Sequence, residues 1–229
     1  MKERKAKIFP LGENALTIEF GNEISVELNN QVIRVGKFLA ENPFAGFEEI
    51  VPAYSSLSLF YDVGKVRKNF QEFSTAYEAV KSFTENALKY AGKIKLKNPR
   101  LIKIPVCFDK EFALDLDFVA TSNNLTPEKF VKIFLDKTYR VFMLGFLPGF
   151  SYMGEVDERI VTRRKQTPRT KVPKGSVGIA GKQTGIYSLE SPGGWQIIGK
   201  TNVELFTPEA DKPTFLQAGD SVQFYESTF

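Results

Sequence analysis

The spacing of apolar residues changes several times along the first part of the chain. Val26 to Leu39 carries apolar residues at helical spacing until Asn42-Pro43 ends the run. On either side of this segment, apolar and polar residues alternate as in half-buried strands, at residues 16–20, 50–54 and 56–61. Pro52 favours an edge strand or a bulge. The pattern predicts a small α+β domain.

A second helix and a linker follow. Thr75 and Glu78 match a capping box. The helix that they open has one apolar face, made of Ala79, Val80, Phe83, Ala87, Leu88 and Ala91. The lysine-rich stretch after it ends in Asn98-Pro99, which disfavours a continuing helix. We therefore place the N-terminal domain at residues 1–92 and a linker at residues 93–100.

Short strand-like runs separated by Gly and Pro dominate the remainder. One helix interrupts them, which Thr126 caps and Pro127 begins. The strand-like runs are residues 102–108, 140–146, 176–180, 185–189, 195–198 and 221–225. Short strands at this density predict a closed or nearly closed β-barrel over residues 101–229.

Composition narrows the chemistry. The apolar fraction of 42% and the charged fraction of 25% are those of an ordinary folded protein. Because the chain has no histidine, it has no Ser-His-Asp or Cys-His site, and we expect no metal site. Acid-base chemistry then requires a shifted carboxylate, a lysine, a tyrosine or a group from another chain. The single cysteine, Cys107, falls in a strand-like run and is expected to be a buried, inert thiol.

Charge and hydropathy bear on partners and location. A net charge of +4 without a nucleic-acid motif indicates small anions or an acidic protein surface as partners, not nucleic acid. The basic N-terminus lacks the apolar core of a signal peptide, and the longest apolar run, Val141 to Leu147, is too short to cross a bilayer. We expect a cytoplasmic protein with no membrane contact.

Residues 145–154 are dense in aromatic residues, Gly and Pro. Glycines allow close backbone approach, and interleaved aromatic rings supply rigid apolar walls. The segment is therefore either the lip of a pocket or a turn between core strands. The candidate pocket walls in it are Phe146, Pro148, Phe150 and Tyr152.

Residues 163–176 form a basic segment stiffened by two prolines. Its cations are suited to a carboxylate or a phosphate, and Arg169 is suited to bidentate binding, with Lys171 as a second candidate. A solvated charged face is the alternative.

Two Gly-rich runs, residues 177–187 and 191–201, alternate turns with short apolar strands. Neither has the spacing of a P-loop or of a dinucleotide-binding loop. Gln183 and Thr184 are candidate polar contacts of a ligand. Gly193, Gly194 and Trp195 are a candidate rim, although a lone tryptophan equally suits a plug in a barrel.

These blocks together closely resemble the carboxyltransferase-domain family that includes KipI-type kinase inhibitors, 5-oxoprolinase subunits of the PxpB type and a section of urea carboxylase and allophanate-related proteins. The family pattern G-F-x-P-G-F-x-Y-L-G, then P-R-x-x-x-P-x-G-S-V-G-I-A-G-x-Q-T-G-I-Y, then S/T-P-G-G-W-x-I-I-G-x-T is met from Gly145 through Thr201. The resemblance implies a cyclophilin-like β-barrel after a separate α+β domain.

The resemblance also implies an activity and partners. It implies a subunit, inactive alone, of an ATP-dependent 5-oxoprolinase that converts 5-oxo-L-proline to L-glutamate. The implied partners are a companion carboxyltransferase-like subunit of the PxpC or KipA type and a LamB/YcsF-type subunit, PxpA. ATP is the implied cofactor of the complex, and whether this chain binds it is open. A phosphorylated substrate needs cationic stabilisation, for which Arg169 with Lys171 or Lys174 is suited.

The resemblance leaves two alternative functions open, and the chain departs from the family pattern at two positions. The same resemblance suits a KipI-type inhibitor that binds a sensor histidine kinase, or a subunit of urea or allophanate metabolism. Family members commonly carry a histidine near the position of Phe134 and often a proline at that of Ser151, neither of which this chain has. The catalytic residues are therefore left open.

Overall fold

The computed structural model describes residues 6–96 and 98–228. It divides into two compact units, Met1–Asn98 and Pro99–Phe229. The division falls within the stretch assigned to a linker. Each unit combines helices with strands, so the predicted α+β class is confirmed. Among the described residues, no helix combines the length and the apolar character needed to cross a membrane.

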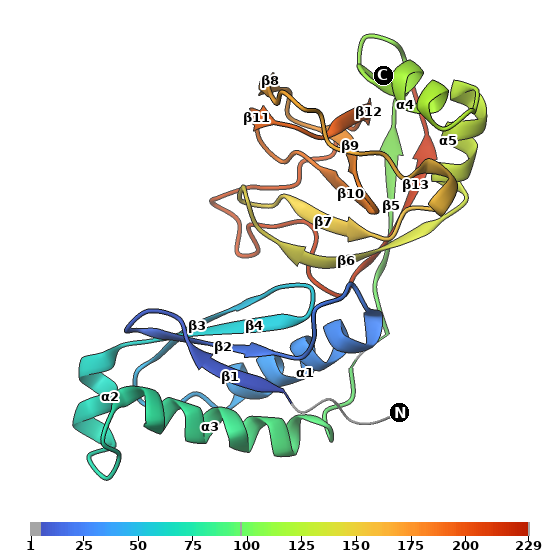
Figure 1. Cartoon of the computed structure of the whole chain (residues 1–229). Helices are drawn as coiled ribbons and strands as arrows, with labels where there is room; N and C mark the ends of the chain where they lie inside the picture. The colour runs from blue at the N-terminus through green and yellow to red at the C-terminus, as the bar shows by residue number, and fades with distance from the viewer. Residues whose placement is uncertain (1–5, 97, 229) are drawn as a thin grey trace. The chain divides into compact units, whose positions relative to one another are not determined.

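The N-terminal unit is an antiparallel sheet of order β1-β2-β4-β3 with helices on one face (Figure 1). Its elements are β1 (Lys7–Pro10), β2 (Ala15–Glu19), α1 (Val26–Glu41), β3 (Phe47–Pro52), β4 (Ser56–Tyr61), α2 (Val63–Asn69) and α3 (Ala76–Ala91). The predicted capping box between Thr75 and Glu78 opens α3. Pro52 ends an edge strand, as expected. Apolar faces of α1, α3, β2 and β4 form one core. Strand β1 and helix α2 were not predicted.

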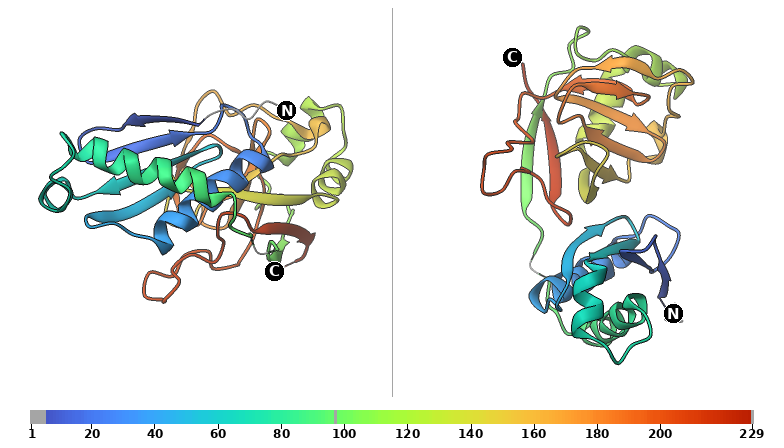
Figure 2. Two further views of the ribbon diagram at one scale, coloured as in Figure 1. Left: turned by 90° about the horizontal axis from the view of Figure 1, so that it is seen from below. Right: turned by 90° about the vertical axis from the view of Figure 1, so that its left-hand side faces the viewer.

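The C-terminal unit is built around a curled sheet of order β12-β9-β10-β7-β6-β13-β5, and β8 and β11 pair separately. Its elements are β5 (Leu101–Val106), α4 (Leu116–Ser122), α5 (Pro127–Leu135), β6 (Thr138–Leu144), β7 (Ser151–Gly154), the 3-10 helix η1 (Glu158–Ile160), β8 (Arg169–Val172), β9 (Ser176–Ala180), β10 (Gln183–Ile186), β11 (Ser191–Gly193), β12 (Gln196–Lys200) and β13 (Ser221–Glu226). Strands β5 and β13 run side by side in parallel (Figures 1 and 2).

The two edges of this sheet meet. Directly after β5, the backbone N–H of Cys107 donates to the carbonyl of Lys200 in β12 at 2.8 Å, and the reciprocal bond is 3.0 Å long. The sheet is thereby closed by a single bridge, as the sequence predicted for a closed or nearly closed barrel. Cys107 is a buried free thiol, also as predicted.

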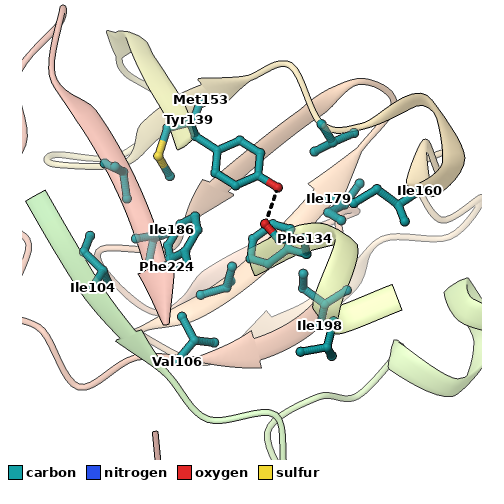
Figure 3. Close-up of a cluster of buried hydrophobic side chains, with 14 of the residues drawn as sticks. Ile104, Val106, Phe134, Tyr139, Met153, Ile160, Ile179, Ile186, Ile198 and Phe224 are labelled. Carbon is teal, nitrogen blue, oxygen red and sulfur yellow. Dashed lines mark hydrogen bonds between the residues drawn. The ribbon is translucent and has the colours of Figure 1, made fainter. Parts of the chain in front are cut away.

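Side chains fill the interior of this barrel (Figure 3). Alternate residues of the strands point inward, among them Ile104, Val106, Met153, Ile179 and Ile186. Helix α5 places Phe134 against the same core, where its ring stacks on Phe224 with centroids 5.0 Å apart. The interior is packed with apolar side chains, so a binding site in this unit belongs on the outer face of the barrel.

One buried hydrogen bond fixes α5 to the barrel. Tyr139 is fully buried, and its hydroxyl donates to the backbone carbonyl of Phe134 at 2.8 Å, as the dashed line in Figure 3 marks. Burial raises the pKa of this phenol well above its usual range. The hydroxyl is therefore a permanent donor at neutral pH.

Replacing Tyr139 by phenylalanine is expected to lower the free energy of unfolding by about 1 to 2 kcal/mol, because a buried carbonyl loses its partner. Urea denaturation of the full chain measures this. Tyr225→Phe is the matched control, because that ring is 47% exposed. Equal losses in the two variants would contradict the assigned role of the bond.

Candidate functional site

Five aromatic rings gather on the outer face of the barrel, and we call them the aromatic cluster: Phe146, Phe150, Tyr152, Tyr187 and Trp195. Phe150 is its centre. Its ring centroid lies 4.8 Å from that of Tyr152, 5.2 Å from that of Tyr187 and 5.4 Å from that of Trp195, each in an edge-to-face arrangement. This geometry is the one aromatic rings prefer. The cluster is therefore a second packed core, of which Phe146 is the exposed part.

The strand period explains why the cluster lies outside the barrel. In β7, Met153 belongs to the barrel core, whereas its neighbour Tyr152 packs with the aromatic cluster. Opposite them, Gly178 and Gly185 are cross-strand partners in β9 and β10. A Cβ on Gly185 would lie 3.0 Å from the ring of Phe150, and one on Gly178 would lie 3.1 Å from the Cβ of Trp195. Gly185 and Gly178 thus leave room for the ring of Phe150 and for the side chain of Trp195.

The rim of the cluster differs in exposure from its centre. Phe150 is 1% exposed and Trp195 is 5% exposed, whereas Phe146 is 61% exposed and has a positive φ of 68°. Of the two interpretations of Trp195, this burial favours a packing role. Pro148 is exposed, and its carbonyl accepts a hydrogen bond from Ser188 Oγ at 2.5 Å.

The two glycines of the predicted rim support neighbouring side chains. A Cβ on Gly193 would overlap the hydroxyl of Tyr187. Gly194 lies beside Pro168, and its carbonyl accepts from the backbone N–H of Lys165 at 2.8 Å. The basic segment is thereby tied to the Pro-Gly-Gly turn.

A buried carboxylate that the sequence did not single out organises the basic segment. Asp115 is 5% exposed at the start of α4. Arg169 donates to both of its carboxylate oxygens, at 2.8 Å from Nη1 and 2.7 Å from Nη2. Lys165 Nζ lies 3.2 Å from Oδ1, and the backbone N–H of Ile197 donates to Oδ2 at 2.7 Å. Both terminal nitrogens of the predicted anion-binding arginine therefore already hold a carboxylate of this chain.

Burial and hydrogen bonding act in opposite directions on Asp115. Burial alone raises the pKa of the Asp115 carboxyl, but the bonds from Arg169, from the Ile197 N–H and from Lys165, together with the charge of Arg169, outweigh it and lower the pKa below its usual value. The carboxylate is charged at neutral pH, and it joins α4, β8 and β12.

The other predicted polar contacts lie in different places. Lys171 is exposed and forms an ion pair with Glu190 at 3.1 Å. Thr184 is fully buried on the same strand face as the core residue Ile186, and its hydroxyl donates to the Gly178 carbonyl at 2.9 Å. Gln183, one residue earlier, is half-buried on the opposite face of β10, where Gly154 and Ala180 are its cross-strand partners. The structure thus places Gln183 on the outer face of the barrel and Thr184 in its interior. The roles of Arg169, Lys171, Gln183 and Thr184 in ligand binding stay predictions.

Comparison with known proteins gives three findings. Residues 6–216 match the family model described as carboxyltransferase domain, subdomain C and D. A Bacillus subtilis protein named as a 5-oxoprolinase subunit is 45% identical over 219 residues, which are 95% of this chain and 91% of that protein. A urea amidolyase of Saccharomyces cerevisiae is 24% identical over 93% of this chain, but over 13% of its own length.

Solved structures add a match of fold. The crystal structure of TTHA0988 superposes with a TM-score of 0.80 at 32% identity, covering 94% of this chain. The chain spans 40% of the length of that protein. The matched segment therefore occurs as part of a longer polypeptide.

Proposed function

We propose, since this chain belongs to the family of the carboxyltransferase domain, subdomains C and D, that it is the PxpB-type subunit of a 5-oxoprolinase. The observation that carries the proposal is the 45% identity to the 5-oxoprolinase subunit of Bacillus subtilis over 91% of that protein. The likeness to urea amidolyase is lower in identity, and it covers a small part of a longer chain. We place the chain in a complex that hydrolyses 5-oxo-L-proline to L-glutamate with hydrolysis of ATP.

The chemistry of a lactam explains the need for ATP. An amide in a five-membered ring resists attack by water, and transfer of a phosphoryl group to its carbonyl oxygen makes that carbon electrophilic. The species formed carries negative charge, which positioned donors stabilise best at a site from which water is largely excluded. The aromatic cluster supplies apolar walls of that kind, with tyrosine hydroxyls among them.

The titratable groups of the cluster act as donors and not as bases. Burial raises the pKa of both Tyr152 and Tyr187 above the usual value of a phenol. Both therefore keep their protons at neutral pH. Since the chain has no histidine, the general base in this proposal is a carboxylate, a lysine or a group of a companion subunit. In this proposal the companions are a second carboxyltransferase-like subunit and a LamB/YcsF-type subunit.

Reconstitution tests the proposal. ATP-dependent release of glutamate from 5-oxoproline is measured with this chain alone, with the companions alone and with the complete set. We expect release only from the complete set. Equal release from the companions without this chain would remove the chain from the reaction.

A further inference from the structure

Arg164 lies over the face of Trp195 at the edge of the aromatic cluster. Its guanidinium carbon is 5.7 Å from the centroid of the indole ring. The side chain is exposed, whereas the indole is 5% exposed. Among residues 6–96 and 98–228, no carboxylate lies within ion-pair distance of Arg164. Arg164 therefore differs from Arg169, whose two terminal nitrogens already donate to the carboxylate of Asp115.

A cation–π contact leaves the hydrogen-bonding capacity of an arginine unused. At 5.7 Å from the centroid of the indole, the guanidinium of Arg164 is within the range of such a contact, which occupies none of its five N–H groups. Two of them match the two oxygens of a carboxylate or of a phosphate. Trp195 thus holds Arg164 in place without occupying its donors.

The neighbouring groups suit the same ligand. Tyr152 and Tyr187 lie close enough for the positive charge of Arg164 to oppose the rise of their pKa that burial causes. Of the two tyrosines only Tyr152 is partly exposed, since Tyr187 is 1% exposed and its hydroxyl packs against Gly193. Phe146 stands exposed beside Phe150 and offers an apolar wall. Arg164, Tyr152 and Phe146 are therefore the parts of this region that reach the surface.

We propose that Arg164 and the aromatic cluster form an oxyanion-binding site, in which Arg164 binds the anion and Arg169 holds the basic segment in place. The identity of the ligand rests on the proposed function: it is the carboxylate of 5-oxoproline or a phosphate group of ATP. Both present two oxygens on one atom, which two N–H groups of a guanidinium can bind at once. The site belongs to this chain and requires no group of another subunit.

The single tryptophan of the chain reports on this site directly. The full-length chain is titrated with 5-oxoproline, with pyrrolidin-2-one, which is the same ring without a carboxylate, with ATP and with inorganic phosphate, while the fluorescence of Trp195 is recorded. We expect a saturable change with an oxyanion and none with pyrrolidin-2-one. Saturation by 5-oxoproline identifies the substrate carboxylate as the ligand, and saturation by ATP and phosphate identifies the nucleotide.

Arg164→Ala is expected to weaken that binding about 10- to 100-fold, since a charged bidentate contact is lost. Arg164→Lys keeps the charge but cannot make two parallel N–H bonds, so its affinity should lie between those of the wild type and of Arg164→Ala. Arg163→Ala is the matched control, because the neighbouring arginine side chain contacts no ring or carboxylate among the described residues. It should bind as the wild type does.

The titration decides this inference, and glutamate release by the complex decides the proposed function. No saturable change with any of the three oxyanions, or equal affinities in the wild type and in Arg164→Ala, would overturn the site even if the complex is active. Saturable binding that needs Arg164 supports the site even if the complex releases no glutamate.

Discussion

Replacing Asp115 by alanine is expected to lower the free energy of unfolding of the C-terminal unit by about 3 kcal/mol, because it leaves cations of a buried ion pair without their partner. The carboxylate is nine-tenths buried and accepts from Arg169, Lys165 and the Ile197 N–H. The loss lies at the lower end of the range for buried pairs, since the side chains of Arg169 and Lys165 are 23% and 28% exposed and regain some hydration.

Urea denaturation followed through Trp195 fluorescence measures this loss, because Trp195 lies two residues before Ile197. Glu204→Ala is the matched control: Glu204 pairs with Lys174 at 2.7 Å, but both side chains are about half exposed. Exposed pairs contribute up to about 1 kcal/mol. Equal effects of the two substitutions would refute a special role for the buried carboxylate.

The stabilisation by Asp115 should also depend on pH. Its pKa is lower in the folded protein than in the unfolded chain, so the unfolded state binds the proton more readily. The contribution is therefore fully present above the unfolded value of about 4 and is lost as the pH falls through the folded value. The difference in unfolding free energy between wild type and Asp115→Asn should narrow as the pH is lowered below about 4. A constant difference would contradict the assignment.

Gly175→Ala is expected to cost about 3 to 4 kcal/mol, the sum of backbone strain and of a steric clash. Gly175 has a positive φ of 83°, and a Cβ there would overlap the carbonyl oxygen of Thr201. The backbone cannot move easily to relieve this overlap, because the N–H of Gly175 donates to the Tyr187 carbonyl and its carbonyl accepts from the Thr201 N–H. Gly175 directly precedes β9, the strand whose Gly178 lies against Trp195.

Gly181→Ala separates the two contributions. Gly181 also has a positive φ, of 62°, but nothing lies within 4 Å of the position of its Cβ. Only strain remains there, so its loss should be about 1 to 2 kcal/mol. Thermal unfolding of the two variants gives the comparison. Similar losses in both would show that the surroundings of Gly175 yield to a methyl group.

Local signals in the sequence predicted much of the fold. The capping residues Thr75 and Thr126 and the change of apolar period located two helices, because these effects act within one turn. Strands β8 and β11 were not predicted, because the sequence of β8 resembles a solvated basic segment and that of β11 a Pro-Gly-Gly turn. Their pairing depends on contacts between them, and not on the pattern within either.

The site was predictable only in part for the same reason. The sequence predicted Phe146, Phe150 and Tyr152 as walls and Trp195 as part of the rim of one pocket, and the structure brings these four rings together. Asp115 carries no local signal, because its partner Arg169 lies 54 residues further along the chain. Adjacent strand residues face opposite sides, so Gln183 and Thr184 do not share one surface.

The place of β13 in the sheet has a consequence for the order in which the barrel is made. This strand follows all others of the unit in the chain, yet it lies between β5 and β6 and pairs with both. The ion pair between Arg100 and Asp220, which fixes the start of β5 beside that of β13, spans 120 residues. On the ribosome, strands β5 and β6 therefore emerge long before the strand that joins them. The barrel closes only when the rest of the unit has been synthesised, and pairings over such a separation form slowly.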